Sequence, residues 1–388
     1  MDPGDLPISA RLRAAFDANF ARGREVGAAL SIWKDGREVL DLSAGHRDAA
    51  RRQPWRPDTL VLIWSATKGM ASACALRAIE SAGCDLETTV AEFWPEFAAA
   101  GKARVTIGDV LSHRAGLGAL DATNLSILDH EAVVLAIEKQ APLRNPEDGP
   151  GYGPRTFGCL VDEIVRRLTG GIALGDYWRR EFAEPLGLDL WIGLPECEHA
   201  RVATMLAVRA GARETKTPFL DAFADPSSLT RRAFSSPGGL QAVSAMNAPA
   251  ARSASIPSMG GIGTASALAK FYAMLAQGGR WEGRAYLGDR ATGWMTTPRS
   301  QGFDKVLRLE TAFSAGFMMD PVDAGGRKIR ALLGPSLAAF GHPGAGGSLG
   351  FADPENGIGF GYVMNQMESG VLPNDRAVTL VRALYKQG

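Results

Sequence analysis

Residues 60–70 read LVLIWSATKGM, an apolar run that ends at Trp64 and passes directly into Ser65 and Lys68. A serine hydroxyl is a weak nucleophile until an adjacent base removes its proton. Residues three apart lie on the same face of a helix, so Lys68 can reach the Ser65 hydroxyl if a helix begins here. The stretch therefore predicts a serine nucleophile with a lysine base.

The same helix start provides two further features that this chemistry needs. Lysine is a base only when neutral, and burial beside the positive end of the helix dipole lowers its pKa from about 10.4. The backbone N–H of Ser65 has no intrahelical acceptor, so it can stabilise an oxyanion. A Ser-x-x-Lys tetrapeptide arises readily by chance, and the structural alternative is a helix start with a solvated lysine. The apolar run before Ser65 favours the catalytic interpretation.

The composition is that of an ordinary globular protein. The 388 residues are 46% apolar and 22% charged, and 42 Lys and Arg balance 42 Asp and Glu. This length corresponds to about two domains. The balanced charge gives no field that attracts nucleic acid or an anionic membrane, so neither is expected as a partner. No HExxH, EF-hand or phosphate-loop pattern occurs, so we expect no metal and no cofactor.

The N-terminal segment and the cysteines are both typical of a cytoplasmic protein. Residues 1–20 contain neither the apolar core nor the small-residue cleavage site of a signal peptide. No apolar run approaches the roughly 18 residues of a membrane span. The cysteines show neither CxxC nor zinc-type spacing, so we expect buried, reduced thiols. They are Cys74, Cys84, Cys159 and Cys197.

Turn dipeptides between apolar runs predict two hairpins, one near each end of the chain. Asp-Gly and Asn-Gly are favoured two-residue hairpin turns. The hairpins are residues 28–44, around Asp35-Gly36, and residues 348–365, around Asn356-Gly357. Residues 312–319 and 332–341 are predicted as further strands, the second interrupted by Pro335.

Helical periodicity dominates the middle of the chain. Apolar residues recur at intervals of three and four in residues 65–82 and 157–168, and more weakly in residues 8–22. A last amphipathic helix is predicted at residues 374–386. Residues 208–256 are rich in Ala, Ser, Pro and Gly and weakly periodic, which indicates a partly ordered lid or an irregular insertion.

This order of elements predicts an α/β fold of the α+β type, because strands lie at both ends and helices between them. We expect residues 1–60 and 255–388 to form one domain, an antiparallel sheet flanked by helices and built from both termini. Residues 61–254 would form an inserted, mainly helical domain that includes the lid-like segment 208–256. The active site would lie at the interface of the two domains.

Several motifs, in order and spacing, resemble those of one family. They are Asp58-Thr59-Leu60, Ser65-Ala66-Thr67-Lys68-Gly69-Met70, Cys84-Asp85-Leu86-Glu87, Phe93-Trp94-Pro95-Glu96-Phe97, residues 106–117 (TIGDVLSHRAGL), Tyr152, Thr156-Phe157-Gly158 and residues 340–347 (FGHPGAGG). The chain is similar in these motifs to the penicillin-binding-protein-like, class C β-lactamase-like serine hydrolases, and most resembles the family VIII carboxylesterases. The likeness covers most of the chain and thins between residues 208 and 255. It implies the β-lactamase/transpeptidase-like fold.

The resemblance implies a role for Tyr152, which falls at the first position of the family's Tyr-x-Asn motif. There a tyrosine, held with the lysine, moves the proton between nucleophile and leaving group. The third position is Pro154 instead of Asn, so the amide that contacts substrate in β-lactamases is absent. Without the family, Tyr152 would be read as a packing residue held in a stiff turn.

The resemblance also places the family's Lys-Thr-Gly motif at His342-Pro343-Gly344. It implies that the Ala345 N–H is the second oxyanion donor, beside that of Ser65, and that Gly344 lets the substrate approach the strand. His342 is expected at the substrate, with either an electrostatic or a structural role. Loss of the constant positive charge of the lysine favours uncharged esters over β-lactams.

Two residues that match other patterns are expected to be structural. Ser348 satisfies GxSxG, but the α/β-hydrolase order needs a histidine after the serine, and none follows Ser348. Its flanks also predict strand instead of helix. His113, which follows an apolar helical turn, is expected to make a structural hydrogen bond.

The sequence thus predicts a carboxylesterase that cleaves short-chain esters through an acyl-Ser65 intermediate, without metal or cofactor. The alternatives at the same centre are a β-lactamase, a D-alanyl peptidase, an amidase or an acyltransferase. A binding protein without activity would be expected to lack Ser65, Lys68 or Tyr152, and all three are present. The expected partner is a small-molecule ester, and homo-oligomerisation is left open.

Overall fold

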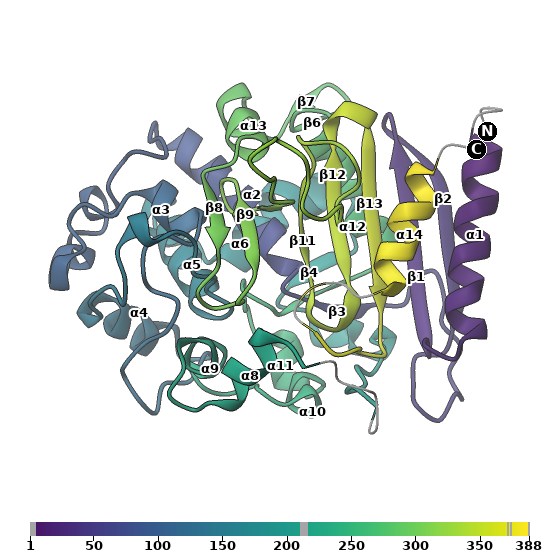
Figure 1. Ribbon diagram of the computed structural model, residues 1–388, viewed down its shortest axis with the longest axis horizontal. Coiled ribbons are helices and arrows are strands. Elements are labelled where there is room, and N and C mark those ends of the chain that lie inside the picture. Colours follow the sequence, from purple (N-terminus) through teal and green to yellow (C-terminus); the bar gives the residue numbers. More distant parts are fainter. Residues whose placement is uncertain (1–4, 210–215, 371, 373–374, 387–388) are drawn as a thin grey trace.

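A central antiparallel sheet of eight strands organises the molecule, in the order β2-β1-β13-β12-β11-β10-β9-β8 (Figure 1). The computed structural model describes residues 5–209, 216–370, 372 and 375–386. The strands are β1 (Gly27–Lys34), β2 (Arg37–Gly45), β8 (Ser300–Phe303), β9 (Glu310–Phe313), β10 (Met318–Met319), β11 (Phe340–Pro343), β12 (Leu349–Asp353) and β13 (Ile358–Met364). Strand β1 pairs with β13, so the two ends of the chain build one sheet, as the sequence predicts.

Both predicted hairpins are present. Strands β1 and β2 pair across Asp35 and Gly36, whose φ angles of 49° and 77° are both positive. Two positive φ angles are the signature of a type I′ turn, whose twist matches that of the strands. Strands β12 and β13 pair across the turn that contains Gly357.

The two other strand predictions were wrong in part. Residues 312–319 are not one strand, because the chain reverses at Gly316, where φ is 88°, and β9 pairs with β10. Glycine reaches this conformation without steric cost. Of residues 332–341 only the last two belong to β11. Pro335 lacks the N–H that a strand interior requires, which accounts for the late start.

Helices cover both faces of the sheet. On one face, α1 (Asp5–Ala21) packs beside α14 (Asp375–Tyr385) (Figure 1). Their apolar residues share a core with alternate residues of β1 and β13. The predicted last helix is therefore present, although Asn374 lies outside the described residues. On the other face, α12 (Ala265–Ala276) packs on β13, β12 and β1.

Glycines in β13 allow α12 to approach the sheet closely. A Cβ atom at Gly361 would lie 2.4 Å from the Ala265 carbonyl oxygen, and one at Gly359 would lie 2.4 Å from that of Ala269. These neighbours are helix backbone, which cannot rotate away as a side chain can. The distance between helix and sheet is thus set by the absence of two side chains.

A small sheet in the order β3-β5-β4 carries the chain into the predicted site. Its strands are β3 (Val61–Trp64), β4 (Leu190–Ile192) and β5 (Gly261–Gly263). All four residues of β3 are buried, and α2 (Thr67–Ser81) follows after two residues. Helix α2 packs against α5 (Thr156–Leu168).

The remaining helices lie mainly between β3 and β5 in the chain. They are α3 (Ile107–Leu111), α4 (His130–Lys139), α6 (Leu174–Trp178), α7 (Glu184–Leu186), α8 (Pro218–Ala224), α9 (Leu229–Ser235), α10 (Val243–Met246), α11 (Pro249–Ser253) and α13 (Asp289–Thr296). Four of these, α8–α11, fall in the segment for which no helix was predicted. None of the four exceeds seven residues, too few to produce a clear helical period. Residues 210–215 lie outside the described part of the chain.

Two sequence expectations concern the surface and the thiols. Within the described residues, no helix is both long enough and apolar enough to cross a membrane. All four cysteines are free. Cys74 and Cys159 are buried as expected, whereas the expectation was wrong for Cys197, which is exposed.

Replacement of Gly361 by Ala should destabilise the fold, because the new methyl group would push α12 away from β13. We expect a loss of about 1–3 kcal/mol in the free energy of unfolding, measured by urea denaturation. The control is Gly293→Ala in α13, where a Cβ atom has no neighbour within 4 Å. That change should be neutral or stabilise by up to about 1 kcal/mol. Equal effects at the two sites would contradict the close packing of α12.

Candidate active site

Ser65 occupies a sharp turn between β3 and α2. Trp64, the last residue of β3, has a φ of 50°, a strained conformation for a bulky residue. The Lys68 N–H donates to the Ser65 carbonyl oxygen over 3.0 Å, which keeps the two residues one turn apart although α2 begins only at Thr67. The Lys68 Nζ lies 3.4 Å from the Ser65 Oγ. The structure thus brings together the serine and the lysine singled out in the sequence.

The Lys68 amine is fully buried and held by two backbone carbonyls. Its Nζ donates to the carbonyl oxygens of Ser258 over 2.7 Å and of Pro154 over 3.0 Å. A neutral amine has two N–H donors and one lone pair. With both donors engaged by carbonyls, the lone pair is left for Ser65. Pro154 stands where the family motif has Asn, and its backbone carbonyl oxygen accepts one of these hydrogen bonds.

The surroundings of Lys68 favour its neutral form. Burial lowers the pKa of Lys68 well below its ordinary value, and the positive charge of Arg155 lowers it further. Within the described residues, the hydrogen-bond partners of Lys68 are carbonyl and hydroxyl oxygens, and no carboxylate is among them. The direction of this shift was predicted from the sequence, whereas the contribution of Arg155 was not.

Tyr152 lies beside the lysine and the serine. Its ring centroid is 4.9 Å from the Lys68 Nζ, and its backbone N–H donates to the buried carboxylate of Asp304. Burial raises the pKa of Tyr152, and a hydrogen bond with Ser65 only partly opposes this. The phenol therefore keeps its proton at neutral pH, and can donate it.

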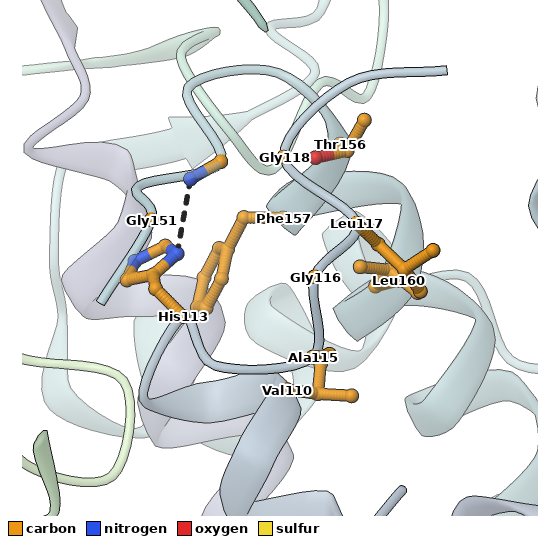
Figure 2. A pocket seen from close by; sticks show the side chains of 11 residues that line it. Val110, His113, Ala115, Gly116, Leu117, Gly118, Gly151, Thr156, Phe157 and Leu160 are labelled. Atoms are coloured by element: carbon orange, nitrogen blue, oxygen red, sulfur yellow. Dashed lines mark hydrogen bonds between the residues drawn. The ribbon is translucent and has the colours of Figure 1, made fainter. Parts of the chain in front are cut away.

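His113 packs behind Tyr152, with ring centroids 4.8 Å apart. Figure 2 shows its hydrogen bond, in which the Gly153 N–H donates to the His113 Nδ1 over 3.1 Å. Burial lowers the pKa of His113 well below its usual value. The adjacent cavity of about 10 Å³ has the space of roughly one water. The structural role predicted for His113 is confirmed, because its hydrogen bond and ring fix the turn that carries Tyr152.

His342 lies on β11 and is also uncharged. Its Nδ1 donates to the Pro343 carbonyl oxygen over 2.7 Å. Burial lowers the pKa of His342 to about 3. Its ring centroid is 5.9 Å from that of Tyr152. A pKa this low leaves the ring uncharged at neutral pH, and both roles proposed for His342 stay predictions.

Two residues that line the same pocket have backbone N–H groups without a protein acceptor in the described chain. Within the described chain, neither the Ser65 N–H nor the Ala345 N–H donates to a protein acceptor, and both residues line one pocket. This arrangement suits an oxyanion hole, which needs converging, unoccupied donors. Close packing requires glycine at position 344, independently of any substrate, because a Cβ atom on Gly344 would lie 2.2 Å from the Ile63 carbonyl oxygen. Neither Gly344 nor His342 is among the residues that line the pocket.

A buried ion pair holds the turn that carries Ala345. Arg376, near the start of α14, donates to the Gly346 carbonyl oxygen over 2.9 Å and to the Glu25 carboxylate over 2.7 Å. Tyr362 donates to the same carboxylate. Both charged side chains are almost inaccessible. The N-terminal and C-terminal ends of the chain therefore meet directly beneath the predicted oxyanion donor.

The pocket beside Ser65 has a volume of about 190 Å³. Its walls are mainly aromatic and aliphatic. They comprise Trp64, Ser65, Pro154, Arg155, Phe223, Arg231, Phe234, Ser235, Leu240, Gln241, Met259 and Ala345. Half of these residues come from residues 223–241, in the segment predicted as lid-like. The sequence gave no signal for them individually, because neither a motif nor a periodic pattern singles them out.

Arg155 fixes the segment that covers this pocket. Its guanidinium donates to the carbonyl oxygens of Pro237, Gly238 and Gly239. The side chain is buried, and burial lowers the pKa of Arg155 to about 10. Its position three residues after Tyr152 is the only sequence signal that connects it with the site.

Ser348 has no catalytic surroundings. Its side chain is buried, and its Oγ has no hydrogen-bond partner within the described residues. Strand β12 follows it, whereas a nucleophile elbow is followed by a helix. Its carbonyl oxygen accepts from the Gly344 N–H over 2.7 Å. The expected structural role of Ser348 agrees with these contacts.

Comparison with known proteins gives consistent matches along the chain. A model of the beta-lactamase family matches residues 12–383. The esterase/beta-lactamase LipL of Mycobacterium tuberculosis is 34% identical over 368 residues, which cover 94% of this chain and 82% of LipL. The structure of a penicillin-binding protein homologue from Caulobacter crescentus superposes with a TM-score of 0.86, at 37% identity and 97% coverage of each chain. That of a family VIII carboxylesterase superposes with a TM-score of 0.85, at 35% identity, covering 98% of this chain and 97% of the other.

Burial of a neutral lysine makes stability depend on pH. Between the lowered pKa of the folded lysine and about pH 10.4, the unfolded chain protonates Lys68 whereas the folded chain does not, so the contribution of Lys68 to stability should rise with pH in this window. Lys68→Met lacks this proton uptake. The free energy of unfolding of wild type relative to Lys68→Met should therefore increase by about 1.4 kcal/mol per pH unit between about pH 8 and 10. Urea denaturation of both proteins measures it. A difference independent of pH would mean that Lys68 is charged in the folded protein.

Proposed function

Because the chain belongs to the beta-lactamase family, as its motifs indicated, we propose that it is a carboxylesterase that acts through an acyl-Ser65 intermediate. The hydrogen bonding of Lys68 carries this proposal. Two carbonyl oxygens accept hydrogen bonds from its N–H donors, and its Nζ, with one lone pair remaining, lies 3.4 Å from the Ser65 Oγ. Such an amine is a general base poised to accept a proton from the nucleophile.

In the acylation step, Lys68 takes the proton of Ser65 as the Oγ attacks the ester carbonyl carbon. The negative charge that develops on the carbonyl oxygen is held by the N–H groups of Ser65 and Ala345. Such preorganised donors are worth about 3–4 kcal/mol each in other serine hydrolases. The fixed turn at Gly346 keeps the second donor in place.

In the collapse of this intermediate, the bond to the alcohol oxygen breaks and the alcohol leaves with a proton. Tyr152 supplies that proton, because its phenol is protonated and hydrogen-bonded to Ser65. The protonated amine of Lys68, 4.9 Å from the Tyr152 ring centroid, restores it. Water then attacks the acyl-Ser65 ester, and the same groups act in reverse to release the acid.

The pocket supports a preference for short acyl esters. A volume of about 190 Å³ is below the range of roughly 300–1,000 Å³ typical of drug-sized ligands. The neutral His342 removes the constant positive charge that the resemblance associates with carboxylate recognition at that position. Two relatives are named an esterase/beta-lactamase and a family VIII carboxylesterase, which supports ester hydrolysis over the alternatives at the same centre.

Replacement of Ser65 by Ala should lower the kcat for p-nitrophenyl butyrate by at least about 10³-fold, because it removes the nucleophile. Ser348→Ala is the matched control. It removes a buried hydroxyl without a partner in the described chain, so most of the activity should remain. The reverse pattern in a steady-state assay would refute the assignment of the nucleophile.

A covalent probe gives an independent test. A fluorophosphonate should modify the Ser65 hydroxyl, because Lys68 makes it the nucleophilic serine of the pocket. Peptide mass spectrometry should find the label on the peptide that contains Ser65. Label on the peptide that contains Ser348 would instead indicate that Ser348, in its GxSxG motif, is the nucleophile.

A further inference from the structure

The pocket beside Ser65 is positively charged on the side formed by α9. Arg231, an exposed residue of this helix, lines the pocket together with Phe223 and Phe234. Its guanidinium carbon lies 4.9 Å from the centroid of the Phe223 ring, which supports the side chain from one face. A guanidinium held over an aromatic ring keeps the N–H donors at its edge open to a ligand.

The neighbours of Arg231 fix the orientation of α9. The Thr230 hydroxyl donates to the Val306 carbonyl oxygen over 2.8 Å. Arg232, the next residue, pairs with Asp121 on the outer side of the segment. Arg232 is absent from the lining of the pocket, whereas Arg231 is present in it. Of the two adjacent arginines, Arg231 therefore lines the pocket, whereas Arg232 pairs with Asp121.

No acidic side chain balances Arg231. None of the residues lining the pocket in the described part of the chain is Asp or Glu, and no ion pair of Arg231 occurs there. The other arginine of the pocket, Arg155, is occupied by three backbone carbonyl oxygens. Arg231 is therefore the pocket arginine whose charge and donors are left for a bound molecule.

We propose that Arg231 is a specificity-determining residue that binds a carboxylate carried by the substrate, so that the preferred substrates are anionic esters. This inference rests on the proposed function and refines it. The loss of lysine at the position of His342 removes one cationic site, and Arg231 provides a different one, on the helix that covers the pocket. A guanidinium binds a carboxylate through two parallel hydrogen bonds, which gives selectivity for charge and for shape.

The test compares anionic esters with neutral esters of matched shape. Monoethyl glutarate and ethyl pentanoate differ at the end of the acyl chain, and 4-acetoxybenzoate and its methyl ester differ on the alcohol side. For at least one pair, Arg231→Gln should lower the ratio of kcat/KM values, anionic over neutral, about tenfold, equivalent to about 1.4 kcal/mol. Arg231→Glu should lower it further. In wild type, raising the ionic strength from about 0.01 to about 0.5 M should also reduce this ratio.

The control is Arg232→Gln, which removes the same charge from the next residue of α9. It should leave the ratio unchanged for both pairs, because Arg232 pairs with Asp121 outside the pocket. Equal effects of the two variants would mean that the net positive charge of α9 sets the ratio, without a specific contact of Arg231, and would overturn the proposal. An unchanged ratio in Arg231→Gln for both pairs would also overturn it.

A binding experiment separates this proposal from the proposed function. If wild type hydrolyses none of the four esters, the esterase assignment fails. Titration calorimetry of the Ser65→Ala protein with monoethyl glutarate and with 4-acetoxybenzoate then tests Arg231 directly. Binding that is about tenfold weaker in the double variant Ser65→Ala, Arg231→Gln than in Ser65→Ala supports the carboxylate site. Equal binding by the two variants, or no binding by Ser65→Ala itself, overturns the site.

Discussion

In the described part of the chain Lys68 is buried without a carboxylate partner, and the rest of the site depends on this constraint. A charged amine at this depth would be costly, so the fold keeps it neutral and supplies carbonyl acceptors from Pro154 and Ser258. A carboxylate in their place would raise the pKa of the amine and remove the base. Arg155, whose guanidinium donates to three backbone carbonyls, is compatible with this requirement because it adds positive charge.

The constraint explains why the site needs parts of the chain that are distant in sequence. The two carbonyls that hold Lys68 precede α5 and β5, while the opposing oxyanion donor lies after β11. Helix α2 therefore has to pack between the helical region and the large sheet. Its residues are almost all buried, and small side chains dominate it. A surface helix with the same Ser-x-x-Lys spacing would have a solvated, protonated lysine and no activity.

Residue types and turn chemistry made much of this predictable. The spacing of Ser65 and Lys68 and the two hairpins follow from local rules, and the structure has them. The prediction of a single strand at residues 312–319 was wrong, because apolar residues flank the turn closely on both sides and resemble one continuous run in the sequence. The acceptors of Lys68 are backbone atoms, which have no signature in the sequence. Arg231 and its neighbours belong to helices of seven residues or fewer, whose position depends on tertiary contacts with Val306 and Asp121.

The contact of Arg376 with Glu25 and Gly346 has a consequence for biosynthesis. The two partners of this ion pair are 351 residues apart, and a ribosome synthesises the N-terminal one first. Arg376 lies in α14 and is made long after Ser65 and Lys68, so the turn beside Ala345 gains this anchor only once α14 has been synthesised. A fragment of the chain that stops before Arg376 would contain the nucleophile and its base but lack the ion pair that holds the turn of the second predicted oxyanion donor.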